Sequence, residues 1–165
     1  MSELSPFQRA WVEVSPAAIE SNARTLLDHL KPGTQLMAVV KADGYGHGAV
    51  TVAIAALRGG ASSLGVATLQ EGLELRAAGI NAPILLLSAL HSADELTRCH
   101  ERGLMPTLSS LEEASLCDRI SAERGGEPFP VQLKVDTGMS RLGADWRIGA
   151  ELVQSIRAMP SLQLV

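Results

Sequence analysis

A lysine stands at the end of a short apolar run near the start of the chain. Residues 36–40, LMAVV, are apolar throughout, as expected of a strand buried on both faces, and Lys41 follows directly. The next residues, ADGYGHG, place three glycines before a helix that we expect to begin near Ala49. This pattern suits amine chemistry beside a bound phosphate at the carboxyl end of a strand. An ordinary strand-to-helix turn with a solvated lysine fits the spacing equally well.

A second group of polar residues lies around residues 131–141. In the segment VQLKVD, residues 131–136, apolar and polar residues alternate, so one face of a strand there is polar. In a barrel the apolar face would meet the outer helices, and Gln132, Lys134 and Asp136 would turn to the interior, where charges are costly unless paired. In an open sheet the same pattern is typical of an edge strand with one wet face. Arg141 either belongs to the same site or is a surface arginine.

These residues need a scaffold, and the chain supplies a regular alternation of strand and helix patterns. Short apolar runs recur at roughly 20 to 30 residues, which is typical of a parallel sheet with connecting helices. The predicted strands cover residues 35–41, 63–67, 84–88, 104–107, 131–136 and 162–165. The capping-box spacing predicts helix starts at Thr68 with Glu71, Ser92 with Glu95, and Ser109 with Glu112.

Two architectures suit this alternation, a closed (β/α)8 barrel and an open doubly wound sheet. No G-x-G-x-x-G follows the first strand, which disfavours a dinucleotide-binding sheet. The last run reaches residue 165 with no helix pattern after it, and a barrel normally needs about 250 residues. We therefore expect an α/β fold, a TIM-type barrel of which residues 1–165 hold about six of the eight strands.

The composition excludes several classes of function. Hydrophobic residues make up 46% of the chain and charged residues 19%, as in a globular domain, and the net charge of -4 offers no basic surface to nucleic acid. Cys99 and Cys117 lack metal-ligand spacing, which predicts buried thiols, no metal site and a cytosolic setting. No signal-peptide pattern begins the sequence, and no window holds the roughly 20 apolar residues of a membrane span. We expect a cytoplasmic protein that binds a small molecule, not a membrane.

Two literal strings are more specific than these patterns. VKADGYGHG, residues 40–48, resembles the pyridoxal phosphate attachment motif of the alanine racemase family, and LKVDTGMSRLG, residues 133–143, resembles a strand and loop in the middle of that family's barrel domain. The resemblance covers essentially the whole chain, including WVEV at residues 11–14, but only the first part of the family's barrel. Ser140 departs from the pattern, because many members have glycine there. Leu85 matches a family leucine that packs near the pyridine ring of the cofactor. The alternative is that Leu85 is an ordinary core residue.

Carried over residue by residue, the resemblance implies a site for pyridoxal 5'-phosphate. Lys41 would form the internal aldimine and act as the base on one face of the substrate, and Tyr45 would help to hold the phosphate. Arg141 would hydrogen-bond the phenolic oxygen of the cofactor. Lys134 matches a family lysine often found carbamylated, which would let it pair with Arg141, and Asp136 would support it.

The activity implied is that of an isomerase, a racemase that interconverts L- and D-alanine for peptidoglycan precursors and is a homodimer when full length. The second base would be a tyrosine from the C-terminal β-domain of the partner subunit. We expect residues 1–165 to be a truncated N-terminal barrel domain without that β-domain, and to be inactive by themselves. The alternative is a non-catalytic carrier of pyridoxal phosphate that uses the same lysine. Serine and broader racemases share these motifs, so they leave the amino acid open.

Overall fold

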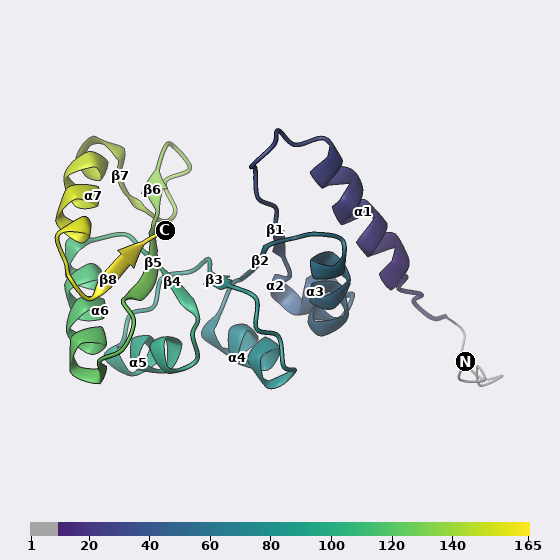
Figure 1. The fold of residues 1–165 in the computed structure, drawn as a ribbon, viewed down its shortest axis with the longest axis horizontal. Coiled ribbons are helices and arrows are strands. Elements are labelled where there is room, and N and C mark those ends of the chain that lie inside the picture. The colour runs from purple at the N-terminus through teal and green to yellow at the C-terminus, as the bar shows by residue number, and fades with distance from the viewer. Residues whose placement is uncertain (1–9) are drawn as a thin grey trace.

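The structure, a computed structural model that describes residues 10–165, is built on one parallel sheet (Figure 1). Six strands lie in the order β1-β2-β3-β4-β5-β8, and all neighbouring pairs run parallel. Their bounds are β1 Met37–Val39, β2 Ser63–Val66, β3 Ile84–Leu86, β4 Met105–Leu108, β5 Phe129–Leu133 and β8 Leu162–Leu164. All six predicted strands are therefore present.

Helices connect successive strands and cover the outer face of the sheet (Figure 1). Their bounds are α1 Pro16–Asp28, α3 Ala49–Arg58, α4 Leu69–Ala77, α5 Ala93–Glu101, α6 Leu111–Arg124 and α7 Gly149–Arg157, with a short 3-10 helix, η1, over Trp146–Ile148. α2, Lys41–Gly46, is not a right-handed helix and is described with the site below. Thr68 with Glu71 and Ser92 with Glu95 form the predicted capping boxes.

The third predicted capping box, Ser109 with Glu112 at the start of α6, is wrong by one residue. Ser110, not Ser109, has the extended backbone of an N-cap, and its side chain accepts a hydrogen bond from the Glu113 N–H. The Glu113 carboxylate in turn accepts from the Ser109 N–H at 2.6 Å. Because serine and glutamate each occur twice in succession here, the spacing alone could not choose between the two alignments.

The strand predicted at residues 131–136 is two strands in the structure. β5 ends at Leu133, and β6, Val135–Asp136, pairs instead with β7, Ala144–Asp145. The backbone changes partner at Lys134, whose N–H donates to the Leu108 carbonyl at 2.8 Å while its carbonyl accepts from the Ala144 N–H at 2.8 Å. Apolar and polar residues alternate in the sequence through the break, which explains why the sequence pattern did not reveal it.

The hydrophobic core lies between the helices and one face of the sheet. Leu64 and Val66 in β2 are fully buried in it, and the free thiols of Cys99 and Cys117 belong to it as predicted. Burial raises the pKa of the Cys117 thiol to about 12. Buried strand residues that share this face are Leu64, Val66, Ile84, Leu86, Leu108, Phe129, Val131 and Leu162.

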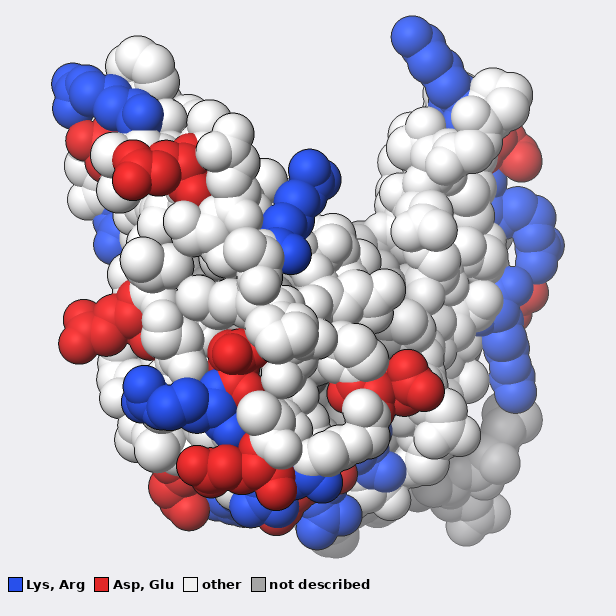
Figure 2. Space-filling view, turned by 60° about the vertical axis from the view of Figure 1, so that its left-hand side comes forward, with Lys and Arg blue, Asp and Glu red and all other residues white. Residues whose placement is uncertain are grey.

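The opposite face of the sheet borders a hollow. Gly65, between two core residues of β2, points to this side: a Cβ there would lie 3.3 Å from Met37 Sδ, 3.4 Å from Val39 Cγ2 and 3.5 Å from Leu87 Cδ1. Side chains of β1 and the end of β3 therefore meet over β2. Figure 2 shows the molecule deeply hollowed between two raised sides.

The order of the strands decides between the two predicted architectures. In a doubly wound sheet the first strand lies inside the sheet and the order reverses from it, whereas here the strands follow the chain from β1 to β8. Within residues 10–165, β1 and β8 each pair on one side only. The fold is thus six strands of a (β/α)8 barrel, open between β1 and β8.

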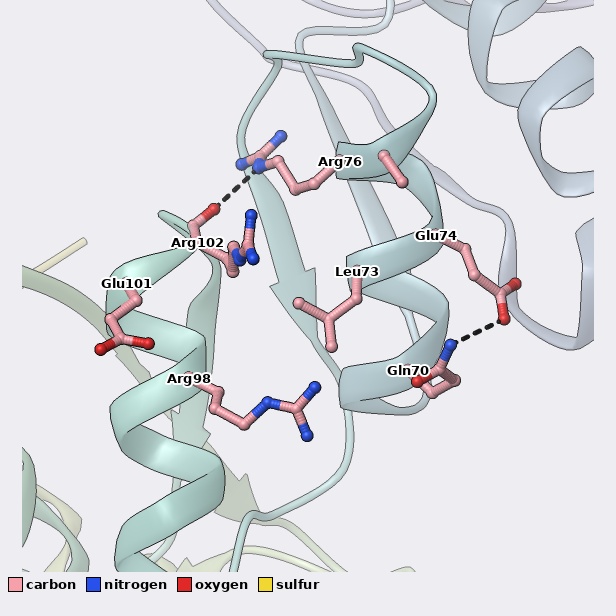
Figure 3. A pocket seen from close by; sticks show the side chains of 8 residues that line it. Gln70, Leu73, Glu74, Arg76, Arg98, Glu101 and Arg102 are labelled. Atoms are coloured by element: carbon pink, nitrogen blue, oxygen red, sulfur yellow. Dashed lines mark hydrogen bonds between the residues drawn. The ribbon is translucent and has the colours of Figure 1, made fainter.

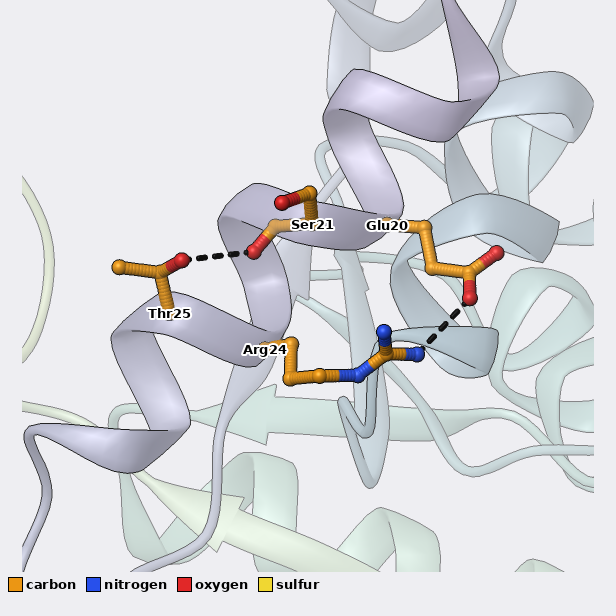
Figure 4. A network of polar contacts seen from close by, with 4 residues as sticks. All are labelled: Glu20, Ser21, Arg24 and Thr25. Carbon is orange, nitrogen blue, oxygen red and sulfur yellow. Dashed lines mark hydrogen bonds and ion pairs between the residues drawn. The ribbon is translucent and has the colours of Figure 1, made fainter.

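α1 precedes this repeat and packs against α3. The contact is close, because a Cβ on Gly59 would lie only 2.4 Å from the Glu20 carbonyl oxygen. On the exposed side of α1, Arg24 Nη2 lies 2.8 Å from Glu20 Oε1, and the Thr25 hydroxyl donates to the Ser21 carbonyl (Figure 4). Such exposed pairs contribute little to stability, so the packing of the buried Ala23 against Gly59 contributes more to holding this helix. Among residues 10–165 no helix combines the length and apolarity needed to cross a membrane.

Candidate functional site

Lys41 follows the end of β1. Val40 before it is fully buried, and its N–H donates to the Gly65 carbonyl at 2.8 Å, which holds the chain to β2 up to this point. The Lys41 side chain is half-buried. An amine at the carboxyl end of a parallel strand lies where barrel folds place their active sites.

The residues after Lys41 form one turn of left-handed backbone where a loop with three glycines was predicted. Ala42, Asp43, Gly44 and Tyr45 have φ values of 51°, 53°, 61° and 56°. For a residue with a Cβ this conformation costs roughly 1–2 kcal/mol, and only one of the four is glycine. Backbone strain of this kind persists only where the surroundings fix it, and it gathers at functional sites.

Two carboxylates hold this turn through backbone amides. Asp43 Oδ1 accepts from the Ala49 N–H at 2.7 Å and so joins the turn to the start of α3. Glu71 Oε1 accepts from the Ala42 N–H at 2.7 Å, although 29 residues separate them. Sequence reasoning gave Glu71 only a helix-capping role and gave Asp43 none. The capping-box rule relates residues at the start of one helix, so it cannot predict a contact between α4 and the turn after β1.

The Glu71 carboxylate also binds its own helix start. Its Oε2 accepts from the N–H groups of Ala67 at 2.7 Å and Thr68 at 3.0 Å. Burial raises the pKa of Glu71, but the hydrogen bonds from Ala42, Thr68 and Ala67 outweigh it, and the net pKa is below the ordinary value. The charged form is therefore the one that this arrangement stabilises.

Tyr45 lies on the same turn, four residues after Lys41. Its side chain is 60% exposed, so the phenol is accessible from solvent. His47 Nδ1 lies 3.0 Å from the Gly44 carbonyl oxygen and 3.1 Å from that of Tyr45, which helps to close the turn.

Leu85 lies on the hollow side of β3. It is buried, but it lines a cavity of about 370 Å³ with Met37, Met105 and Gln132, toward the amino ends of the strands. The register pairs Val39 with Gly65 and Gly65 with Leu85. Extending that register by two residues brings Leu87, not Leu85, level with Lys41.

The polar face predicted for residues 131–136 is only partly directed at the hollow. Gln132 lines the cavity described above, and Lys134, half-buried, follows it on the same side by alternation. Asp136 instead serves its own loop: Oδ1 accepts from the N–H groups of Gly138 at 2.9 Å and Ser140 at 3.0 Å. These bonds hold the pKa of the Asp136 carboxyl below its ordinary value.

Arg141 is exposed at the end of that loop. The residue before it, Ser140, has a φ of 55°, the left-handed conformation in which glycine is more stable. Lys41, Lys134 and Arg141 all follow the carboxyl ends of parallel strands, so they lie at one end of the sheet, with β2, β3 and β4 between the first and the other two. Within residues 10–165 no ion pair joins them to a carboxylate.

A separate groove of about 400 Å³ lies between α4 and α5 on the outer side of the sheet (Figure 3). Of the three arginines that line it, Arg76 is engaged in the fold: it donates to the carbonyls of Arg102 at 3.0 Å, Gly103 at 2.7 Å, Ile80 at 2.6 Å and Ala82 at 2.8 Å. The guanidinium fastens the ends of two helices, and burial lowers its pKa. Arg76 in this groove therefore has a structural role, and we do not consider the groove a second candidate for the functional site.

The sequence matches one protein family over most of its length. A family model described as alanine racemase, N-terminal domain, matches residues 14–165. The alanine racemase of Prochlorococcus marinus is 55% identical over 164 residues, which are 99% of this chain and 42% of that protein. The alanine racemase of a Nostoc species is 48% identical over 158 residues, 95% of this chain and 41% of that protein. The chain thus spans about two fifths of the length of these curated relatives.

Several solved structures have the same fold as this chain. Alanine racemase from E. faecalis superposes with a TM-score of 0.85 at 35% identity, over 92% of this chain and 41% of that one. Alanine racemase from Bacillus anthracis with bound L-Ala-P gives 0.82 at 32% identity, over 98% and 42%. Histidine racemase from Leuconostoc mesenteroides gives 0.80 at 29% identity, over 96% and 42%. These matches agree with a partial barrel.

Proposed function

The chain belongs to the alanine racemase N-terminal domain family, and from this premise we propose that it is the cofactor-carrying part of a pyridoxal 5'-phosphate-dependent racemase. The observation that carries the proposal is the placement of Lys41. A primary amine stands at the carboxyl end of an apolar strand, on a strained turn that Glu71 and Asp43 hold in place. A lysine that forms a covalent bond to a carbonyl cofactor needs such a fixed position.

The donors at this end of the sheet fit the chemistry of the cofactor. The exposed phenol of Tyr45, on the same turn as Lys41, suits a phosphate oxygen, and the guanidinium of Arg141 suits the phenolic oxygen. Lys134, if carbamylated, would become an anion able to pair with Arg141, with Asp136 fixing the loop between them. When bound, pyridoxal phosphate supplies the electron sink that stabilises negative charge on the substrate α-carbon.

In this proposal Lys41 has two roles. Its Nζ anchors the cofactor and, when released, takes the α-proton from one face of the substrate or returns it. Leu87, level with Lys41 by register, and Leu85, one pair of residues below it, would form the apolar floor under the ring. The register makes Leu87 the closer of the two.

Racemisation also needs a proton donor and acceptor on the opposite face. Tyr45 is the only tyrosine among the 165 residues and lies on the Lys41 turn, hence on the Lys41 side. We therefore propose that the second base comes from a partner subunit in a homodimer of the full-length protein. We expect that the 165 residues by themselves do not racemise alanine. The two bases act as a unit, so the loss of one of them removes most of the activity.

Alanine is the substrate that we propose, since the curated relatives named above are alanine racemases. The similar structure of a histidine racemase shows that the same fold occurs with another amino acid in its name. Interconversion of the L and D forms of alanine, serine and histidine by the full-length protein would separate these cases. A cytoplasmic location and a supply of D-alanine to peptidoglycan belong to the same proposal.

Covalent trapping tests the proposal directly. The protein is saturated with pyridoxal phosphate, reduced with borohydride and digested, and the labelled peptide is identified by mass spectrometry. We expect the label on Lys41 and its loss in both Lys41→Ala and Lys41→Arg, because only a primary amine at this position forms the bond. Label on Lys31 or Lys134 instead would contradict the assignment. Label on Lys41 without racemase activity in the full-length protein would favour a non-catalytic carrier.

A further inference from the structure

Three helices of the barrel begin with a glutamate in the same capping position, and one of the three does something more. Glu71, Glu95 and Glu113 are each the third residue of α4, α5 and α6. Each carboxylate accepts hydrogen bonds from the backbone that leads into its own helix. Within residues 10–165, only the Glu71 carboxylate of these three also accepts from a different connection, through the bond from the Ala42 N–H.

The extra bond lies next to Lys41. Glu71 Oε1 receives the N–H of Ala42, the first left-handed residue of the strained turn, while Oε2 receives the N–H of Ala67. Ala67 directly follows β2, and extending the β1–β2 register by two residues brings it level with Lys41. One carboxylate therefore ties the ends of β1 and β2 together at the level of the lysine. The Ala42 amide shares its peptide plane with the Lys41 carbonyl, so fixing that N–H fixes the backbone from which the lysine side chain leaves.

β1 needs such a tie at its carboxyl end. Within residues 10–165 it pairs only with β2, and the regular pairing ends where the left-handed turn begins. A turn with this backbone strain would relax to a commoner conformation if its hydrogen bonds were lost, and the direction of the Lys41 side chain would change with it.

We propose that Glu71 is a positioning residue for Lys41. It makes no contact with the reacting atoms; it acts by holding the Ala42 amide, and thereby sets the direction in which Lys41 Nζ meets the cofactor carbonyl. The inference rests on the proposed function and adds to it a role for Glu71 that its capping-box motif does not indicate. Because a small displacement of a reacting group can cost about 100-fold in rate, a bond to the neighbouring peptide is sufficient to matter.

The test compares Glu71→Gln with Glu95→Gln in the full-length protein. Both changes weaken an N-terminal capping box, so their effects on helix stability should match. Only Glu71→Gln affects the Ala42 bond, because glutamine has a single acceptor oxygen, which cannot accept from the Ala42 N–H and from the Ala67 and Thr68 N–H groups at once. Hydrogen exchange without cofactor is measured first: the amide of Ala42 should exchange about tenfold faster or more in Glu71→Gln and at the wild-type rate in Glu95→Gln.

The second measurement concerns Lys41. The rate constant for its modification by pyridoxal phosphate, trapped with borohydride, should fall about 10- to 100-fold in Glu71→Gln, and kcat should fall while KM changes little. Glu95→Gln should keep both rates. Glu71→Asp, whose shorter side chain cannot span both turns, provides a second variant with the same expected pattern if the glutamine variant does not fold.

The outcomes separate the two proposals. If wild-type Lys41 is not labelled, the proposed function fails, and the positioning role with it. If wild-type Lys41 is labelled, but the Glu71 variants label at the wild-type rate or slow no more than Glu95→Gln, the function stands and the positioning role is overturned. Unchanged exchange at Ala42 would overturn it as well.

Discussion

The two polar segments at the carboxyl end of the sheet are held in different ways. The Lys41 turn is fixed to other elements of the fold, since Glu71 reaches it from α4 and its own Asp43 joins it to α3. The loop of residues 136–143 is fixed from within, because Asp136 binds amides two and four residues ahead. Met139, in the middle of that loop, is 76% exposed.

This difference suits the two proposed tasks. A covalent anchor must point in one direction before the cofactor arrives, and long-range hydrogen bonds supply that fixed geometry. A loop that contributes one guanidinium to a bound group can be set by its own turn, because hydrogen bonding to an anion tolerates some adjustment. Changes in the two segments should therefore have different consequences for Lys41.

The largest contrast is expected between Asp43→Ala and Asp136→Ala. Asp43→Ala removes the bond that joins the strained turn to α3, and we expect it to lower the free energy of unfolding by about 1 kcal/mol and to slow labelling of Lys41 by pyridoxal phosphate. Asp136→Ala should loosen only the loop of residues 136–143 and leave Lys41 labelling unchanged. Chemical denaturation and the borohydride assay measure the two effects. Equal labelling rates in both variants would remove the distinction between the segments.

An intermediate effect is expected from acid. The folded state lowers the pKa of Glu71 below its reference value of 4.5, so its contribution to stability is complete above pH 4.5 and is lost as the pH falls through the depressed pKa. The Tm difference between wild type and Glu71→Gln should thus be largest near neutral pH and shrink toward about pH 3. Thermal unfolding followed by circular dichroism provides the measurement. A difference that stays constant over this range would mean that the charge of Glu71 does not contribute.

The smallest effect is expected at Ser140. Ser140 has a φ of 55°, so replacing it with glycine should relieve backbone strain in the loop. The greater freedom of glycine in the unfolded chain should offset part of this gain in stability. We expect a gain of about 0.5 kcal/mol, seen as a slightly higher midpoint of denaturation, and no change in Lys41 labelling. Ser140→Ala is the matched control and should give no gain. A loss of stability in Ser140→Gly would show that the serine side chain contributes more than its backbone costs.

Much of the barrel could be predicted from local pattern. The apolar runs of the strands and the capping boxes at Thr68 and Ser92 depend on neighbouring residues, and they appear in the structure as predicted. The errors lie where local patterns are ambiguous or silent: the doubled serine before α6, the change of partner at Lys134 and the left-handed turn after Lys41. The glycines of that turn indicated unusual backbone, but not that Ala42, Asp43 and Tyr45 would share it.

The sequence by itself determined the family and the parallel α/β class and led to the prediction for Lys41, because a literal motif and a hydrophobic period are properties of adjacent residues. Only the tertiary structure decided that the strands wind in barrel order, that Leu87 stands level with Lys41, and that Asp136 is used by its own loop. It alone revealed the bond between Glu71 and Ala42. The physical reason is that such contacts depend on which strands become neighbours and in what register, and no local spacing in the chain encodes that choice.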